Sequence, residues 1–492
     1  MGQIKRSLNA VTSIFQKITV KLQAELKHKK TMKINQEQGC IKRRKNSRPA
    51  TTAYPTDTTN EINRLIQEYQ STKAPIEVSF RNLVHWIKVG ERATHYIHPY
   101  PAKLLPQIAH FFLASNVLAD ATDIILDPFS GTGTVALEAN LSGRDAYYCD
   151  ANPLARLIAK SKTEKYSNLD FHGTEEEMRK KYARSRASKC PDVVNIDIWY
   201  SKLAQRNLTR LRSAIEWHPE GIIKTLMWVT FSATARKVSN ADPRLSVPVR
   251  LQSHDEAEKT RKDVWPIFSS QWKSNLNRLQ ELERLRVGSA ATTFNVGDDA
   301  RSLKYPTGDD NAPIHHLPKD SVGLIITSPP YAGAQKYIRA SSLSLGWLKL
   351  AETSQLKALE NKNIGREHFS KATYEKLPKT GVDAADQLLE KVFKINPLRA
   401  TIAGVYINEM RLAINEMTRV LKPGGHLVMI IGDNDVCKMH FKSSEYLATI
   451  FEEIGLKPVI KLVDEIRSRG LMTKRNRTAS IISREWVLVY RK

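Results

Sequence analysis

The segment Asp127-Pro-Phe-Ser-Gly-Thr-Gly-Thr134 has the residue types of a ligand-binding turn. It lies between a short apolar run at residues 124–126 and a helical pattern at 135–141. Glycines let a backbone pass close to a ligand, and the start of a helix offers free N–H groups. The segment lacks the three-glycine pattern that binds dinucleotides and the lysine of a phosphate-binding loop. Alone, it therefore predicts a ligand site only weakly.

The segment Ser328-Pro329-Pro330-Tyr331 is more specific, because it directly follows a predicted buried strand at residues 322–326. Its two prolines stiffen the turn and remove two backbone donors, so the Pro329 carbonyl can point into a cleft as a fixed acceptor. The ring of Tyr331 offers a face against which a flat base could stack. A lone Pro-Pro-Tyr is equally compatible with a surface loop or a ligand for another domain, but its place after a strand favours a site.

Acidic residues follow two further predicted strands. Asp150 ends the run at residues 145–150, where its carboxylate could accept hydrogen bonds from both ribose hydroxyls of a nucleoside. Asp299, or its neighbour Asp298, ends the run at 294–299 and could bind an adenine amino group. The spacing therefore predicts a nucleoside-binding site.

Strands and helices alternate along the parts of the chain that contain these residues. Apolar runs at 124–126, 145–150, 294–299, 322–326 and 427–431 predict strands, and Leu421-Lys-Pro-Gly-Gly425 is expected to close a helix before the last of them. This alternation predicts an α/β fold with a doubly wound, mostly parallel sheet that binds ligands at the carboxyl ends of its strands. Segments 457–463 and 485–490 suit an antiparallel edge hairpin.

A large insertion separates the second and third strands, since Asp150 and Asp299 are 149 residues apart and a strand-helix-strand step needs only about 30. Residues 161–290 contain 24 Lys and Arg, 16 Asp and Glu, and five of the eight tryptophans. A basic, aromatic, mainly helical insertion fits a nucleic-acid-reading region. The alternative is a helical insertion whose tryptophans are core.

Charge points to a polyanionic partner. The 492 residues include 76 Lys and Arg against 51 Asp and Glu, a net charge of +25, and residues 1–50 alone contain 13 basic and two acidic residues. Clustered cations favour phosphate polymers through counterion release. This basic arm, which also has an apolar helical stripe between Leu8 and Leu26, is read as a nucleic-acid arm or dimerisation helix, or else as a solvated tail.

Several classes of protein and site are disfavoured. The four cysteines are widely spaced, which argues against a disulfide framework, and no cluster predicts a metal site. The most apolar window, residues 108–126, contains His110, Asp120 and Asp123, so no membrane span is expected. Together with the absence of a signal-like segment, this predicts a cytoplasmic protein.

Together the motifs resemble those of the S-adenosylmethionine-dependent amino-group DNA methyltransferases, which modify cytosine N4 or adenine N6. The resemblance covers about residues 80–165 and 290–490, and it implies a Rossmann-like methyltransferase sheet. Four domains are expected: a basic arm and linker (1–60), a cofactor-binding half (61–165), an inserted target-recognition region (166–290) and a catalytic half (291–492). The matching pieces are His98-Pro-Tyr-Pro-Ala-Lys103, the 127–134 segment, Asp150, Asp299-Ala-Arg301, Ser328 to Tyr331 and Leu421 to Gly425.

The resemblance also implies roles for single residues around S-adenosylmethionine. Asp150 would hold the ribose and Asp299 the adenine, while Tyr100 and Lys103 would complete the pocket near the methionine carboxylate. The turn after the first strand would line the methionine side of the cofactor; its implied cofactor-binding residues are Asp127, Phe129, Gly131, Gly133 and Thr134. No metal is expected.

The implied reaction is a direct in-line methyl transfer to an amino nitrogen. Hydrogen bonds to the Ser328 hydroxyl and the Pro329 carbonyl would orient that nitrogen, and Tyr331 would stack on a base flipped out of double-stranded DNA. Serine in the first motif position favours cytosine N4, so the expected protein is a site-specific cytosine-N4 methyltransferase of a restriction-modification system, with a possible partner nuclease. Adenine N6, an RNA guanine amino group and a catalytically silent nucleic-acid-binding subunit remain alternatives.

Overall fold

The computed structural model describes residues 57–85, 87, 92–101, 103–167, 169–171, 173–186, 189–251, 263–286, 291–305, 315–333, 336–465 and 484–492. The predicted basic arm at residues 1–50 lies outside these ranges. Residues 54–492 form one compact unit, to which the following description applies.

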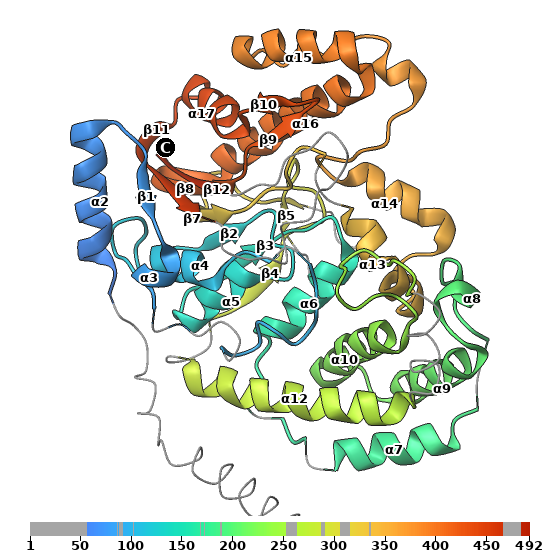
Figure 1. The fold of residues 1–492 in the computed structure, drawn as a ribbon. Coiled ribbons are helices and arrows are strands. Elements are labelled where there is room, and N and C mark those ends of the chain that lie inside the picture. The colour runs from blue at the N-terminus through green and yellow to red at the C-terminus, as the bar shows by residue number, and fades with distance from the viewer. Residues whose placement is uncertain are drawn as a thin grey trace, which may run out of the picture. The chain divides into compact units, whose positions relative to one another are not determined.

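An eight-stranded sheet with the order β1-β11-β12-β8-β7-β2-β3-β4 is the centre of this unit (Figure 1). All neighbouring strands are parallel except the two pairs that contain β12. The predicted doubly wound, mostly parallel sheet is confirmed. The strands are β1 (Ile76–Val78), β2 (Ile125–Asp127), β3 (Ala146–Tyr148), β4 (Thr293–Asn295), β7 (Val322–Thr327), β8 (Leu421–Ile431), β11 (Lys457–Glu465) and β12 (Arg484–Arg491), and two small hairpins pair β5 (Lys304–Tyr305) with β6 (His315–His316) and β9 (Asn434–Val436) with β10 (Met439–Phe441).

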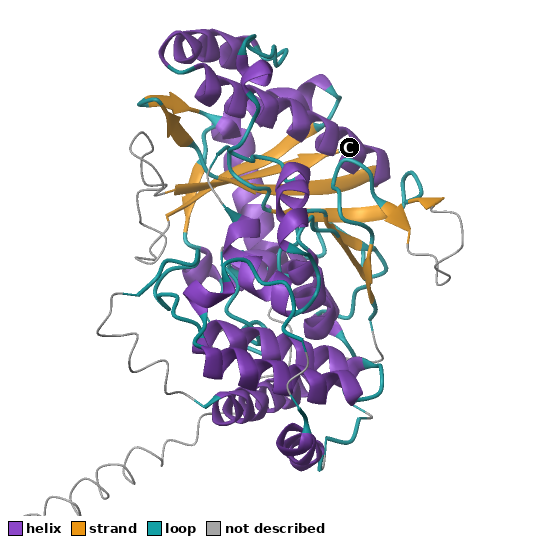
Figure 2. Cartoon of the chain, turned by 90° about the vertical axis from the view of Figure 1, so that its right-hand side faces the viewer, coloured by secondary structure: helices purple, strands orange, loops and turns teal. Residues whose placement is uncertain are grey.

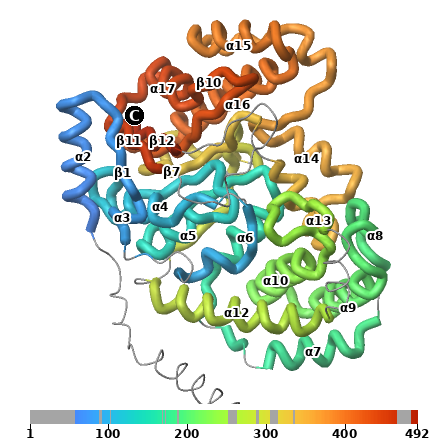
Figure 3. The backbone as a smooth tube through the Cα atoms, viewed as in Figure 1, coloured from blue at the N-terminus to red at the C-terminus, as the bar shows by residue number. Residues whose placement is uncertain are grey.

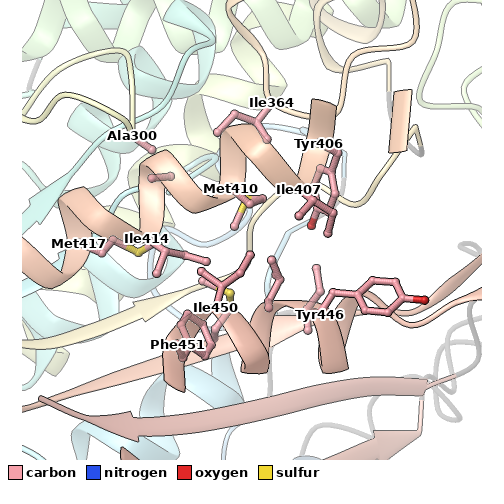
Figure 4. Packing of buried hydrophobic residues seen from close by; sticks show 14 of the residues in the cluster. Ala300, Ile364, Tyr406, Ile407, Met410, Ile414, Met417, Tyr446, Ile450 and Phe451 are labelled. Atoms are coloured by element: carbon pink, nitrogen blue, oxygen red, sulfur yellow. The ribbon is translucent and has the colours of Figure 1, made fainter. Parts of the chain in front are cut away.

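Both faces of the sheet are buried, because successive residues of each strand point to opposite sides. In β8, Leu427 and Met429 pack in one cluster with helices α16 and α17, whereas Val428 and Ile430 pack in a second with α4 and α5. Figure 4 shows residues of the first cluster, and Figure 2 shows helices on both sides of the strands. The helices named are α4 (Pro106–Leu113), α5 (Thr134–Leu141), α16 (Pro397–Val420) and α17 (Ser443–Glu453), and α2 (Thr59–Thr72) and α3 (Phe80–Leu83) also contribute to the second cluster.

The predicted antiparallel hairpin is present as β11 and β12. A strand that the sequence pattern did not predict, β1, pairs in parallel with β11 and extends the sheet by one strand beyond the hairpin. The basic loop that joins the hairpin strands, residues 466–483, lies outside the described residues.

The segment Leu421-Lys-Pro-Gly-Gly425 follows directly on a helix end, as predicted, and also begins a strand, which was not predicted. Helix α16 already ends at Val420, and the segment forms the first part of β8. Gly424 has φ +79°, and the pairing of β7 with β8 shifts register between Val322 and Leu324, so the strand starts irregularly. The motif therefore begins a strand here.

The insertion is helical in its described residues (Figure 3), and its apolar side chains share one core cluster with Leu137 and Leu141 of α5 and with Leu343 and Trp347. Trp272 is buried in that core, and Trp199, Trp228 and Trp265 pack against it, whereas the Trp217 side chain is 57% exposed. Four of the five tryptophans therefore take part in packing, although Trp199 is only partly buried. The helices of the insertion are α7 (Thr174–Arg184), α8 (Ile196–Trp199), α9 (Lys202–Trp217), α10 (Ile222–Val238) and α12 (Val264–Leu285).

Candidate functional site

The carboxyl ends of β2, β3 and β7 bring the predicted site segments together at one edge of the sheet. Oδ1 of Asp127, at the end of β2, accepts a hydrogen bond from Oγ1 of Thr327, at the end of β7, at 2.7 Å. The backbone N–H of Gly131 donates to Oδ2 of Asp150, just beyond β3, at 2.8 Å. The glycine turn is thus tied to the Asp150 carboxyl, and the strand that carries Ser328 is tied to the start of this turn.

The two glycines of the turn adopt left-handed backbone conformations, with φ +50° at Gly131 and φ +73° at Gly133. A Cβ on Gly131 would meet no atom within 4 Å, so that side of the turn is open to a ligand. A Cβ on Gly133 would lie 2.8 Å from the Cβ of Ala159 on α6 (Pro153–Thr163). Gly131 therefore serves an open face, whereas Gly133 serves helix packing.

This contrast predicts different stability costs for the same substitution. Gly131→Ala should lower the free energy of unfolding by about 1–2 kcal/mol, the cost of left-handed backbone for a residue with a Cβ. Gly133→Ala should cost about 1–3 kcal/mol more, because the added methyl also overpacks the contact with Ala159. Urea unfolding of both variants measures the difference, and equal losses would contradict the packing role.

Asp150 lies in a network of backbone hydrogen bonds, and its predicted contact with ribose stays a prediction. Its oxygens accept backbone N–H groups of Gly131 and Asn152, each at 2.8 Å. Burial raises the pKa of Asp150 to about 6, although these hydrogen bonds oppose the rise. The turn and the carboxyl therefore form one hydrogen-bonded unit.

Asp127 makes its contacts within the protein. Besides Thr327, its Oδ1 accepts the backbone N–H of Phe129 at 3.2 Å, and burial raises the pKa of Asp127 to about 7. These bonds fix the path of the turn. The cofactor-binding role predicted for the Asp127 side chain stays a prediction, and the structure assigns that side chain a positioning role.

Asp299, the predicted adenine ligand, is held by an ion pair. Its oxygens accept Nε and Nη2 of Arg301 at 2.8 and 2.9 Å, and Arg301 also donates to Glu409 on α16 at 3.1 Å. Its neighbour Asp298 accepts Nζ of Lys362 at 2.9 Å. Contact with a ligand from either acid stays a prediction.

Tyr100 and Lys103 belong to the segment that runs from His98 to Lys103. Asn152 connects Tyr100 to Asp150, because its backbone N–H donates to Asp150 and its side chain to Tyr100. Nδ2 of Asn152 donates to the Tyr100 hydroxyl at 3.0 Å. Nζ of Lys103 donates to the carbonyl of His98 at 2.7 Å, and burial lowers the pKa of Lys103 to about 8. Lys103 thus carries a largely desolvated charge whose hydrogen-bond partners are backbone carbonyls.

Lys162 is a buried lysine that the sequence analysis missed, and burial lowers its pKa well below the usual value. Its side chain is fully buried, and its Nζ donates to Oγ1 of Thr132 in the glycine turn at 3.0 Å. No ion pair joins it to a carboxylate of the described chain. A signal existed, since Lys162 follows Leu154, Ala155, Ile158 and Ala159 on the apolar face of α6.

The turn Ser328 to Tyr331 continues directly from β7. Tyr331 is buried, its hydroxyl donates to Oε1 of Glu485 on β12 at 2.8 Å, and it is hydrogen-bonded to the side chain of Ser328. Burial and the neighbouring Glu485 raise the pKa of Tyr331 well above its usual value. A Cβ on Gly365 would lie 3.1 Å from the Tyr331 carbonyl oxygen. Sequence reasoning missed both Glu485 and Gly365.

Two further properties bear on the kind of site. In the described ranges, no group of three or more His, Cys, Asp and Glu side chains could hold a metal ion. No helix of those ranges is long and apolar enough to cross a bilayer. The geometry thus offers a glycine turn, a carboxyl at a strand end, one buried and one half-buried lysine, and a proline-stiffened turn with a hydroxyl.

Comparisons with known proteins found similarity to methyltransferases. A profile of a DNA methylase family, N6_N4_Mtase, matches residues 14–161. The type II methyltransferase M.MvaI of Kocuria varians is 22% identical over 409 residues, which are 79% of this chain and 87% of the relative. M.BsoBI of Geobacillus stearothermophilus is 23% identical over 456 residues, 82% of each chain. A S-adenosylmethionine-dependent methyltransferase structure from Methanosarcina mazei aligns over 80% of this chain and 99% of its own with 11% identity and a TM-score of 0.29.

Proposed function

This chain belongs to the amino-group family of S-adenosylmethionine-dependent DNA methyltransferases, and on that premise we propose that it methylates cytosine N4 at specific sites in duplex DNA. The observation that carries the proposal is the Ser328 to Tyr331 turn, joined to the glycine turn through the Thr327–Asp127 hydrogen bond. The relatives named as type II methyltransferases support a role in a restriction-modification system. A cognate nuclease is part of the same proposal.

The residues present fit S-adenosylmethionine. The open face at Gly131 admits a ligand against the backbone, and the adjoining carboxyl of Asp150 can accept ribose hydroxyls. Lys162 is buried and Lys103 is half-buried, and neither is paired with a carboxylate in the described chain. Burial lowers the pKa of both lysines, so a ligand carboxylate beside them would favour their charged forms and would suit this region. When bound, the cofactor supplies a methyl group on a positively charged sulfur, which is open to nucleophilic attack.

The protein's part in the reaction is to orient a weak nucleophile. The lone pair of an amino group conjugated to a base is delocalised into the ring. Hydrogen bonds from its N–H groups to the Ser328 hydroxyl and the Pro329 carbonyl would favour a pyramidal nitrogen with its lone pair aimed along the line of displacement. Tyr331, whose hydroxyl is anchored on Glu485, would support the base after it leaves the duplex.

The choice of base is tested by mass spectrometry of nucleosides from DNA methylated by the purified chain. We expect N4-methylcytosine, because a serine hydroxyl occupies the first position of the turn. N6-methyladenine without N4-methylcytosine would overturn the cytosine assignment and leave the family assignment in place. Methyl groups found only in RNA, or in neither polymer, would contradict the DNA methyltransferase activity itself.

A further inference from the structure

A groove beside the catalytic turn is formed by both the insertion and the catalytic half. One wall includes Trp199 and Pro248 of the insertion, and the other is built by α13 (Tyr337–Trp347), the 3₁₀ turn η2 (Thr353–Gln355), α14 (Leu356–Lys362) and residues 366–373. In Figure 1, α8 and α14 lie on either side of α13. The cavity volume is about 1110 Å³. That exceeds the roughly 300–1,000 Å³ of small-molecule sites and suits part of a polymer.

The wall from the catalytic half is basic. Arg339 and Lys357 are exposed, and neither has an ion-pair partner in the described part of the chain. Arg366 lies over the ring of Phe369 at 4.7 Å and also pairs with Glu409. Glu360 is the single carboxylate among the described lining residues. The groove therefore combines free positive charge with aromatic rings.

The groove adjoins the proposed reaction centre at two places. Gly365, next to the lining residue Arg366, packs against the carbonyl of Tyr331. On α13, Ser341 accepts a hydrogen bond from Asn152 of the Asp150 turn at 2.8 Å, while Arg339 and Ser342 line the groove. A polymer in the groove would thus pass directly beside the turn that is proposed to hold the target base.

We propose that this groove binds the DNA strand next to the target base, with Arg339 and Lys357 contacting phosphates and Trp199 and Phe369 facing bases. The inference rests on the proposed function and deepens it, because DNA contacts come from the catalytic half as well as from the insertion. Positive charge that has no ion-pair partner among the described residues suits phosphates, and aromatic rings suit the faces of unpaired bases. The phosphate contacts contribute affinity independent of sequence.

The test compares two double variants of the full chain. Arg339→Ala/Lys357→Ala removes the two free cations of the groove, and the control Lys391→Ala/Lys394→Ala removes two exposed lysines from α15 (Asp383–Ile395), which supplies no groove residue. Binding of a fluorescent mixed-sequence DNA duplex is measured over a range of salt concentrations, and cofactor binding is measured by calorimetry. The groove variant should bind DNA more weakly, with a log–log salt slope smaller by about 2. The control should keep the slope, and all proteins should bind the cofactor alike.

The outcomes separate this inference from the proposed function. A groove variant with the affinity and salt slope of the unmodified protein would overturn the inference, even if the protein methylates DNA. An unmodified protein that binds DNA through the groove but transfers no methyl group to it would overturn only the proposed function. If only the control variant showed a smaller salt dependence of DNA affinity, the phosphate contacts would lie on α15, and the inference that the groove binds DNA would be overturned.

Discussion

Ser328→Ala is expected to lower turnover by about 100- to 1,000-fold, the scale for removing one positioned hydrogen-bonding group from a reaction centre. The hydroxyl lies directly after β7 and is hydrogen-bonded to Tyr331, so its loss removes both an acceptor for the target amino group and a support for the ring. Cofactor affinity should change little, because the cofactor contacts are assigned to the glycine turn and Asp150. Single-turnover kinetics with saturating DNA, together with calorimetry of cofactor binding, measure both quantities.

Ser321→Ala is the matched control, because Ser321 precedes the same strand at its opposite end. It should keep normal turnover. Normal turnover in Ser328→Ala would remove the catalytic role from the turn. Tyr331→Phe and Tyr331→Ala then separate the roles of hydroxyl and ring: the first loses only the bonds to Glu485 and Ser328, whereas the second should also lose base stacking and be the slower enzyme.

Asp150→Ala is expected to weaken cofactor binding by about 1–3 kcal/mol, the scale for losing hydrogen bonds to a charged group. Hydroxyl donors bind the ionised carboxylate best, and the pKa of Asp150 is raised to about 6. Affinity should therefore rise as pH increases through about 6. It should fall again above about 8, where Lys103 loses the charge that a ligand carboxylate would need.

Calorimetric titrations with the cofactor between pH 5 and 9 check this profile. On its acid limb, below about pH 6, and on its alkaline limb, above about pH 8, affinity should change by at most about tenfold per pH unit. Asp150→Asn should remove the acid limb and keep the alkaline limb, and Lys103→Met should do the reverse. If the loss of affinity at acid pH persists in Asp150→Asn, another acidic group causes it. Asp127 would then be the first candidate, because its pKa is raised to about 7.

The central part of the sheet was predictable because each of its strands has a recognisable local pattern in the sequence. The runs that became β2, β3, β7 and the last part of β8 are apolar and end in turn residues, and parallel strands place their carboxyl ends at one edge. β1 was missed because its three residues are too short to show an alternating pattern. Leu421 to Gly425 was recognised as a helix end but not as part of a strand, because Pro and Gly usually end an element; in the structure Leu421 pairs with β7, and Gly424 and Gly425 form backbone hydrogen bonds with Lys492.

Partners distant in sequence were not predictable in the same way. Glu485 bonds to Tyr331 across 154 residues, and Arg301 bonds to Glu409 across 108. Nothing near Tyr331 or Asp299 in the sequence identifies these partners, because they are set by packing of α16 and β12 against the strand ends. Lys162 differs, since its position on the apolar face of α6 was visible in the sequence but was overlooked.

The central claim is that this sheet edge transfers a methyl group from S-adenosylmethionine to an amino nitrogen of DNA. The most direct measurement incubates the purified chain and its Ser328→Ala variant with duplex DNA and a cofactor whose methyl group is deuterated, followed by mass spectrometry of the nucleosides. We predict a deuterated methyl on an exocyclic amino group, with a much slower appearance in the variant although it binds the cofactor normally. No labelled nucleoside from the unmodified chain, or equal labelling by the variant, would contradict the account.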